Sequence, residues 1–322
     1  MAGRIKDAMK IIAFALVFTV VLYTVSFTVF SPQSVGKTSS KLADAYSFMS
    51  EPENSIDIVA LGNSNLYSGF VPTILWEKYG YTSSVSAAPH QTPLESKMLL
   101  EQLLQSQKPQ LLILETDMLY DGGAADENES VFSRFYDDFE YAVSSSATVY
   151  EFHNAWKSLK KSDRSHKYSH GYYYNNDVEP VEYSGYMDYT EEVQNPNVKA
   201  ASQFEELVSF CKSNSIEILL LEMPATNTWN YARHNAVSVL ARNYGVEFID
   251  ANIALDEIGI ELASCFRDKG FHLNFDSASL LTEYVGSFIR DTYHLDSRAG
   301  EAELADYWDN EVRLFREYYK IA

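Results

Sequence analysis

The sequence is poor in cysteine and in positive charge, and each shortage excludes a class of function. Of 322 residues only two are cysteines, Cys211 and Cys265, and neither stands in a CxxC pair. Zinc sites built from cysteine pairs are therefore excluded, whereas a single disulfide stays open. The chain has 25 Lys and Arg against 45 Asp and Glu, a formal net charge of −20. Because such a chain repels phosphates, we expect no nucleic-acid partner.

A stretch near the N-terminus lacks charge altogether. Residues 11–30 are almost all apolar, and about 20 apolar residues suffice to cross a bilayer. The basic residues before this run (Arg4, Lys6 and Lys10) place residues 1–10 in the cytoplasm and the rest of the chain outside. A cleaved signal peptide is the alternative, but the run is long and no A-x-A site follows it. The pattern predicts a single-pass anchor in the cell membrane.

The residues after the anchor are polar and lack a complete nucleotide-binding motif. Residues 31–53 are rich in Ser, Lys, Pro and Glu and predict a linker. They contain GKT at 36–38, but the first glycine of a P-loop would stand at Ser31. No phosphate-binding loop is therefore expected.

Beyond residue 54, apolar runs of strand length alternate with helical patterns. The expected strands are 55–62, 83–88, 109–116, 216–224 and 246–250. The expected long helices are 71–80, 92–107, 200–214, 228–245 and 275–293. Buried strands separated by helices predict an α/β fold with a doubly wound, mostly parallel sheet over residues 54–295. The charged tail, residues 296–322, predicts one amphipathic helix.

One connection in this pattern is far too long for a loop. Residues 118–199 separate the third strand from the next helix and predict an inserted cap. The segment is rich in tyrosine, which suits contact with sugar faces, although an insertion packing its own tyrosines is an equal alternative. His166 and His170 have the spacing of a helical metal pair, but Gly171 and the absence of an acidic partner argue against a metal. We expect no metal site.

The stretch "IVALGNSNLYSGF", residues 58–70, begins as a buried strand and breaks into small polar residues. In open parallel sheets ligands bind outside the carboxyl ends of the strands, where Ser64 is expected to lie. Ser64 is therefore a candidate nucleophile. The alternative is an ordinary turn or helix-cap residue.

A serine nucleophile needs a base, and His272 is the best candidate for it. It lies in "FRDKGFHLNFDSA", after the fifth expected strand and directly before the last core helix. Asp268 precedes it by four residues, so that the chain order is Ser, Asp, His. A structural histidine and a surface aspartate are the alternatives, and a Ser–His dyad is the reduced form of the prediction.

Four blocks together resemble the SGNH (GDSL-like) hydrolase superfamily. They are "LGNSNLYSGFVP", "KPQLLILET", "ILLLEMP" and "FHLNFDSA". With the membrane anchor, the chain is most similar to the branch that includes the D-alanyl transfer protein DltD and the alginate O-acetylation (AlgX/AlgJ-like) proteins. The resemblance implies a flavodoxin-like sheet, Ser64 as nucleophile, His272 as base, and oxyanion donors from the Ser64 N–H and the second block.

The sequence departs from the family pattern at three places. Residues 86–91 have no glycine where the second block offers a backbone N–H. Asp117 stands where the third block carries an asparagine, and Asp268 is one residue further from the histidine than usual, because Lys269 occupies the family position. The side chains that we consider as substitutes in the substrate or oxyanion site are Asn65, Gln91, Asp117 and Asn227.

The resemblance implies acyl chemistry without a cofactor. The expected reaction is serine-dependent transfer of an acyl group to or from hydroxyls of a cell-envelope polysaccharide or teichoic acid, beside a membrane-bound O-acyltransferase partner. A deacylating esterase is the nearest alternative. A catalytically silent binding or scaffold protein is the alternative from another class, and the missing glycine and asparagine favour it.

Overall fold

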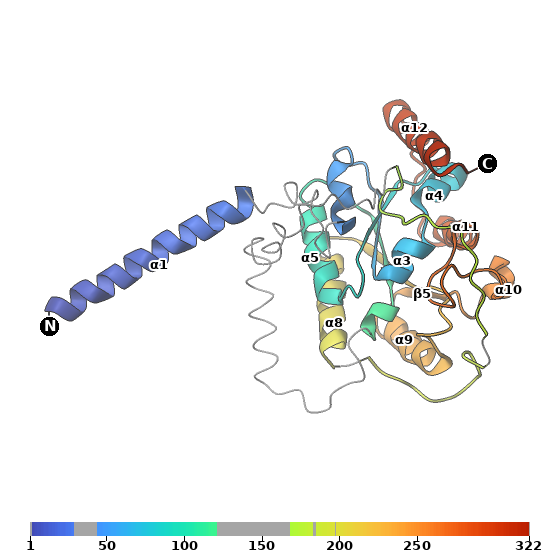
Figure 1. The fold of residues 1–322 in the computed structure, drawn as a ribbon, viewed down its shortest axis with the longest axis horizontal. Coiled ribbons are helices and arrows are strands. Elements are labelled where there is room, and N and C mark those ends of the chain that lie inside the picture. Colours follow the sequence, from blue (N-terminus) through green and yellow to red (C-terminus); the bar gives the residue numbers. More distant parts are fainter. Residues whose placement is uncertain (1, 29–43, 121–167, 183–184, 197, 322) are drawn as a thin grey trace. The chain divides into compact units, whose positions relative to one another are not determined.

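The computed structural model describes residues 2–28, 44–120, 168–182, 185–196 and 198–321 (Figure 1). The chain divides into two compact units, one made of residues 1–43 and 128–163 and the other of residues 44–127 and 164–322. The described part of the first unit is helix α1. The second unit holds the sheet.

Helix α1 spans Ala2–Thr28 and is long enough to cross a membrane. At 1.5 Å per residue its 27 residues extend about 40 Å, more than the ~30 Å of a bilayer core. Its window Met9–Ser26 has a mean hydropathy of 2.1. The hydroxyls of Thr19 and Thr24 donate to carbonyls one turn earlier, which satisfies these polar groups within the helix. A signal sequence would have the same length and hydropathy, and the orientation of α1 stays a prediction.

The second unit is built on a five-stranded sheet with the order β2-β1-β3-β4-β5. The strands are β1 (Ile58–Gly62), β2 (Ser83–Ala87), β3 (Leu111–Glu115), β4 (Glu217–Glu222) and β5 (Glu247–Asp250). Every neighbouring pair is parallel. In the centre, Ala60 of β1 lies opposite Val85 on one side and Ile113 on the other, and all three are fully buried. The predicted α/β class with a doubly wound parallel sheet is confirmed.

Helices connect the strands. They are α3 (Ser64–Gly69), α4 (Pro72–Tyr79), α5 (Pro93–Leu103), α8 (Val198–Ser213), α9 (Tyr231–Tyr244), α10 (Leu255–Ile258), α11 (Phe275–Thr292) and α12 (Ala302–Tyr319). The start of α5 follows from its sequence. Thr92 accepts from the Glu95 N–H while its own N–H donates to the Glu95 carboxylate, a capping box, and Pro93 occupies the first helical position.

The helices form layers on the two faces of the sheet. Helices α5 and α8 pack against each other, and α4 packs against α11 (Figure 1). Helix α11 is tied to the segment after α3, since Thr282 Oγ1 accepts from the Val71 N–H at 2.9 Å. The sheet is therefore covered on both faces, and its carboxyl edge carries the polar turns that follow the strands.

The compact unit begins earlier than residue 54. A 3₁₀ helix spans Asp44–Ser50, with Ala45 and Phe48 fully buried, and Ser47 Oγ donates to the carbonyl of Val85 in β2. Residues 44–53 of the expected linker are thus part of the core, because their apolar side chains cover the edge next to β2.

The described end of the expected cap belongs to the core as well, while residues 121–167 lie outside the described residues. Tyr172 is fully buried, and the carbonyl of His170 accepts from the Val85 N–H at 2.8 Å. The Tyr173 N–H donates to the carbonyl of Tyr67 in α3 at 2.7 Å. The segment therefore passes directly beside the helix that begins at Ser64. A cap over the sheet edge stays a prediction for residues 121–167.

The C-terminal tail forms the expected amphipathic helix, α12. Its Trp308 is fully buried and stacks on Trp76 of α4 and on the ring of His170, with ring centroids 5.6 and 3.9 Å apart. The tail is therefore packed on the core. The two cysteines, both described, are separate buried thiols, and burial raises the pKa of Cys211 and of Cys265 to about 12.

Candidate active site

Ser64 lies at a strand–turn–helix junction on the carboxyl edge of the sheet. Strand β1 ends at Gly62, Asn63 is the N-cap, and Ser64 is the first residue of α3. Asn63 Oδ1 accepts from the Asn65 N–H at 2.8 Å, which fixes the turn. Ser64 is partly exposed, whereas Asn63 and Asn65 beside it are buried. This arrangement presents the hydroxyl to solvent at a helix N-terminus, where negative charge is stabilised.

Gly62 allows this junction to form close to β3. A Cβ at position 62 would lie 2.6 Å from Cβ of Glu115 and 2.8 Å from Cβ of Leu66. The Glu115 carboxylate in turn accepts from the Asn63 N–H at 3.1 Å and from the Asp117 N–H at 2.9 Å. A buried carboxylate thus holds the turn before Ser64 against the turn after β3.

His272 and Asp268 are brought together by the loop before α11. Asp268 accepts from the His272 backbone N–H at 2.7 Å, and its other oxygen is in direct contact with His272 Nδ1. The side chain of His272 is 20% exposed, and that of Asp268 is 37% exposed. Burial alone would raise the pKa of Asp268, but the hydrogen bonds and charge of His272, with the charge of Arg267, leave this pKa below its ordinary value. A carboxylate on Nδ1 leaves Nε2 available as a base.

The histidine loop is anchored on the helix that starts with Ser64. The His272 ring lies nearly parallel to the ring of Tyr67, at 9° and with centroids 6.5 Å apart. Arg267 Nη2 donates to Ser68 Oγ at 2.8 Å, and Ser68 Oγ donates to the Ser64 carbonyl at 2.8 Å. Ser64 and Tyr67 are one helical turn apart, so His272 and the candidate nucleophile border the same short helix.

The contact that would complete a catalytic pair is not formed. Within the described residues, no hydrogen bond joins Ser64 Oγ to His272. Catalytic hydrogen bonds are often long without substrate, so this geometry does not remove the pair as a candidate. The Ser64 N–H, an orphan donor of the helix N-terminus, also lacks an acceptor in the described part of the chain. It is thus available for an oxyanion.

Two of the expected oxyanion side chains have structural roles in this geometry. Gln91 is fully buried, and its Nε2 donates to the Ser86 carbonyl at 3.2 Å and to Ser96 Oγ at 2.9 Å, which uses both of its hydrogens. Asn227 Nδ2 donates to the Lys269 carbonyl at 2.8 Å and so braces the histidine loop. As placed, Gln91 points into the core and Asn227 toward the loop.

Asn65 and Asp117 do lie beside the nucleophile. Asn65 Nδ2 donates to Asp117 Oδ2 at 3.2 Å, and Asn63 Nδ2 approaches the same oxygen at 3.4 Å. Asp117 also accepts from Arg233 Nη1 at 3.3 Å. Asp117 therefore orients two asparagines and pairs with an arginine.

A row of buried carboxylates at the strand ends was not expected from the sequence. Glu115 ends β3, Glu222 ends β4 and Asp250 ends β5. Burial, reinforced by the charges of Glu115 and Asp117, raises the pKa of Glu222 well above its ordinary value, although the hydrogen bond from Thr116 lowers it. The signal in the sequence was that an acid closes the third, fourth and fifth strand segments.

The structure also contains a second Ser–His–Asp group, formed by two residues of α9 and the last residue of β5. Ser238 Oγ lies 3.3 Å from His234 Nε2, and His234 Nδ1 lies 2.8 Å from Asp250 Oδ2. Ser238 follows His234 by one turn in the middle of a helix, where backbone N–H groups are used by the helix itself. Asp250 also accepts from Trp229 Nε1 at 2.9 Å. Because Ser238 lies inside a helix that uses its own backbone N–H groups, we interpret this group as a packing network.

Comparisons with known proteins give structural likeness only. No family model matches the chain, and no curated protein matches it. An acylhydrolase candidate from Bacteroides fragilis is similar over 77% of this chain and 94% of its own, with 11% identity and a TM-score of 0.40. A candidate lipolytic protein of the G-D-S-L family from Desulfitobacterium hafniense (12% identity, 72% and 98% covered, TM-score 0.40) is also similar.

A GDSL-like lipase from Bacteroides thetaiotaomicron is similar at 10% identity, with 74% of this chain and 89% of its own covered and a TM-score of 0.38. At these values the likeness assigns neither a family nor an activity to the chain. The candidate site therefore depends on its own geometry and on the sequence blocks.

Proposed function

We propose that this protein is a serine-dependent acyltransferase or esterase that acts on acyl esters of hydroxyl groups in a cell-envelope polysaccharide or teichoic acid. The observation that carries the proposal is the placement of Ser64 at the N-terminus of α3 with a free N–H, beside a His272–Asp268 pair anchored on the same helix. The sequence blocks that resemble the SGNH superfamily support the same assignment.

The reaction follows from these groups. The Ser64 hydroxyl gives its proton to His272 Nε2 as Oγ attacks the acyl carbonyl, while Asp268 holds Nδ1–H. The Ser64 N–H donates to the oxyanion that forms. His272 then protonates the leaving oxygen, which leaves acyl-Ser64. A glycan hydroxyl, or water in an esterase, next loses its proton to His272, attacks the acyl carbon and restores Ser64.

Helix α1 supports an anchored protein. We propose from the basic residues before its apolar run that the site lies outside the cytoplasm, and from the resemblance that a membrane-bound O-acyltransferase is the partner that delivers the acyl group. We expect protease added to spheroplasts to digest residues 44–322. Complete protection of this part would contradict the orientation.

The test of the serine assignment compares two serines. Full-length protein in detergent is treated with a fluorophosphonate probe and with p-nitrophenyl acetate. Ser64→Ala should lose labelling and ester hydrolysis by a factor on the order of 10³ or more. Ser238→Ala is the matched control, because it removes the hydroxyl that does contact a histidine, and it should keep both activities. Loss in Ser238→Ala with retention in Ser64→Ala would overturn the proposal.

The second candidate function is a catalytically silent scaffold of an acylation complex. The missing Ser64–His272 hydrogen bond within the described residues favours it, as does Asp117 at the asparagine position. Wild-type protein that neither labels nor hydrolyses, alone or with membranes that contain its partner, would support this second candidate.

A further inference from the structure

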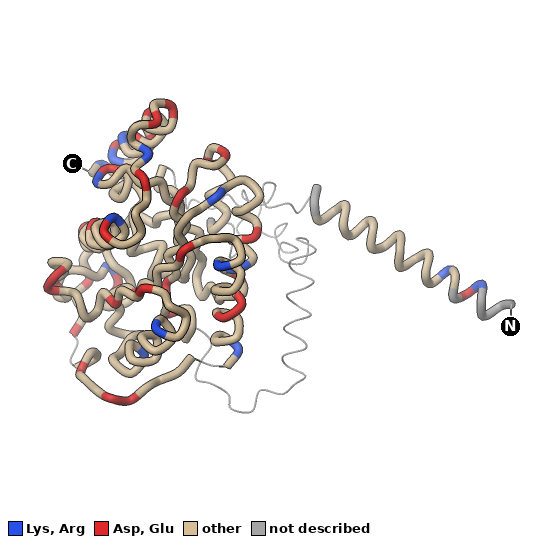
Figure 2. The backbone as a smooth tube through the Cα atoms, turned by 180° about the vertical axis from the view of Figure 1, so that it is seen from behind, with Lys and Arg blue, Asp and Glu red and all other residues tan. Residues whose placement is uncertain are grey.

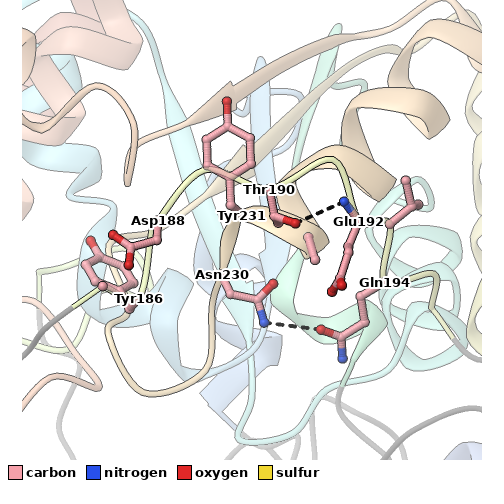
Figure 3. Close-up of a pocket in the computed structure, with 10 residues that line it drawn as sticks. Tyr186, Asp188, Thr190, Glu192, Gln194, Asn230 and Tyr231 are labelled. Carbon is pink, nitrogen blue, oxygen red and sulfur yellow. Dashed lines mark hydrogen bonds between the residues drawn. The ribbon is translucent and has the colours of Figure 1, made fainter.

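A cavity outside the Ser64 site lies between the described end of the insertion and the start of α9. Its volume is about 510 Å³, within the roughly 300–1,000 Å³ of small-molecule sites. Residues 185–194 form one wall, and residues 230–232 form the other (Figure 3). The loop from β4 leads into α9, so this wall lies at the carboxyl edge of the sheet, as Ser64 does.

The walls of this cavity are held to each other by hydrogen bonds. Asn235 Nδ2 donates to the carbonyls of Thr190 and Glu192, each at 2.8 Å. The Gln194 N–H donates to the Ala232 carbonyl at 3.0 Å, and Asn230 Nδ2 donates to Gln194 Oε1 at 3.2 Å (Figure 3). The cavity is therefore formed before any ligand binds, which lowers the entropic cost of binding.

Its lining combines aromatic rings, carboxylates and amides. Tyr231 lies between an end with Tyr186 and Asp188 and an end with Glu192 (Figure 3). The rings of Tyr189 and Tyr231 pack edge to face, with centroids 5.1 Å apart. Aromatic faces stack on the C–H faces of sugars, while carboxylates and amides bind hydroxyls.

The charge of the lining decides which sugars fit. Asp188 and Glu192 are the charged residues among those that line the cavity, and neither Lys nor Arg is among them. Arg233, one turn into α9, is committed to Asp117, to the Thr228 carbonyl and to the face of Tyr120. Acidic residues also lie along much of the core unit (Figure 2). A phosphate or uronate group would be repelled by these two carboxylates, and no cationic side chain in the lining would offset that repulsion.

From this geometry we propose that the cavity between residues 185–194 and α9 binds a hydroxyl-rich sugar that is uncharged or carries an amino group. It is the subsite that selects the glycan. This inference rests on the proposed function, which makes the glycan the acyl acceptor. It deepens that function by favouring a neutral or amino polysaccharide over teichoic acid as the acceptor. The Arg233–Asp117–Asn65 contacts connect this subsite to the turn that carries Ser64.

Binding is measured by calorimetry on the full chain in detergent, with Ser64→Ala as background so that no turnover occurs. The probes are the pentasaccharides of N-acetylglucosamine and of glucosamine, the pentasaccharide of galacturonic acid and a glycerol-phosphate oligomer, each to millimolar concentration. We expect the first two to bind and the two anionic probes to give no heat. Tyr231→Ala should weaken binding about tenfold, while Tyr318→Ala, an exposed tyrosine of α12, should leave it unchanged.

Three results would overturn the subsite. They are binding of an anionic probe at least as tight as that of the amino sugar, no binding of any probe, and equal binding by Tyr231→Ala. Asp188→Asn with Glu192→Gln provides a further measurement, because it should admit the galacturonate probe while the fold is retained. Calorimetry measures binding without ester chemistry. An inactive Ser64 would therefore leave the binding result valid, and a lack of sugar binding in this cavity would leave the test of Ser64 as nucleophile valid.

Discussion

Two Ser–His–Asp groups lie in one core, and they differ in what surrounds them. In one, Ser238 and His234 of α9 and Asp250 of β5 form an unbroken hydrogen-bonded chain. At the sheet edge, the chain from Asp268 to His272 stops short of Ser64 within the described residues. Of the two groups, the Ser64 group is the one with a backbone N–H at a helix start that lacks an acceptor within the described residues. The comparison teaches that side-chain contacts alone do not identify a nucleophile, because the oxyanion must also be stabilised.

The largest effect that separates the two groups is expected at the histidines. His272→Ala should reduce fluorophosphonate labelling and ester hydrolysis on the order of 10³-fold, because it removes the base proposed to take the Ser64 proton. The double variant with Ser64→Ala should be little worse than either single one, since the two act as a unit. His234→Ala is the control and should retain activity. Stopped-assay rates at saturating ester give the comparison.

The aspartate of the sheet-edge group should matter less than its histidine. Asp268→Ala removes the partner of His272 Nδ1, but Asp268 is 37% exposed, so water replaces part of its role. We expect a loss on the order of 10²-fold in kcat with little change in KM. A loss equal to that of His272→Ala would mean that His272 leaves its position when Asp268 is absent. No loss at all would mean that Ser64 and His272 act as a dyad.

The aspartate of the α9 group should act on stability instead. Asp250 is buried and accepts from Trp229 Nε1 and the Asn252 N–H besides contacting His234. Asp250→Ala leaves these donors unpaired, which should lower the free energy of unfolding by about 2–3 kcal/mol. Thermal melting measures this, while labelling of the variant at 20 °C below its Tm should match the wild type. Loss of labelling in an Asp250→Ala variant that is still folded would indicate that the catalytic residues are those of the α9 group.

The smallest effect concerns the pH dependence of stability. As the pH rises, the carboxyls of Glu222 and Asp268 should change the free energy of unfolding in opposite directions. The raised pKa of Glu222 means that the folded state binds the Glu222 proton more tightly than the unfolded state does. This group therefore lowers stability as the pH rises above 4.5, the ordinary pKa of the side chain. The lowered pKa of Asp268 contributes stability above pH 3.8, which is lost as pH falls through its folded value.

Glu222→Gln should therefore melt about 2–4 °C higher than the wild type at pH 8, the shift that about 1 kcal/mol produces in a domain of this size. The difference should shrink toward pH 4.5. Melting curves at both pH values measure it. A variant that is less stable at pH 8 would show that Glu222 is ionised and satisfied in the folded protein.

Much of the fold follows from local patterns. The continuous apolar runs before Gly62 and at 109–116 predict buried parallel strands, and the Thr92–Glu95 pair predicts the start of α5. Residues 168–175 were expected in a cap and belong to the core, because the packing of Tyr172 depends on contacts with α11 and α12 that are remote in sequence.

The sequence by itself determined where the candidate catalytic residues stand along the chain. A serine follows the first strand, a histidine precedes the last core helix, and an acid lies four residues before that histidine. Only the tertiary structure decided which side chains face the site. Gln91 donates to groups only five residues away, but it does so from a fully buried position. Asn227 donates to the carbonyl of Lys269, which is remote in sequence, and the contact of Glu115 with the Asn63 N–H forms only when β1 and β3 are paired. Such choices depend on burial and long-range contact, which one-dimensional spacing does not encode.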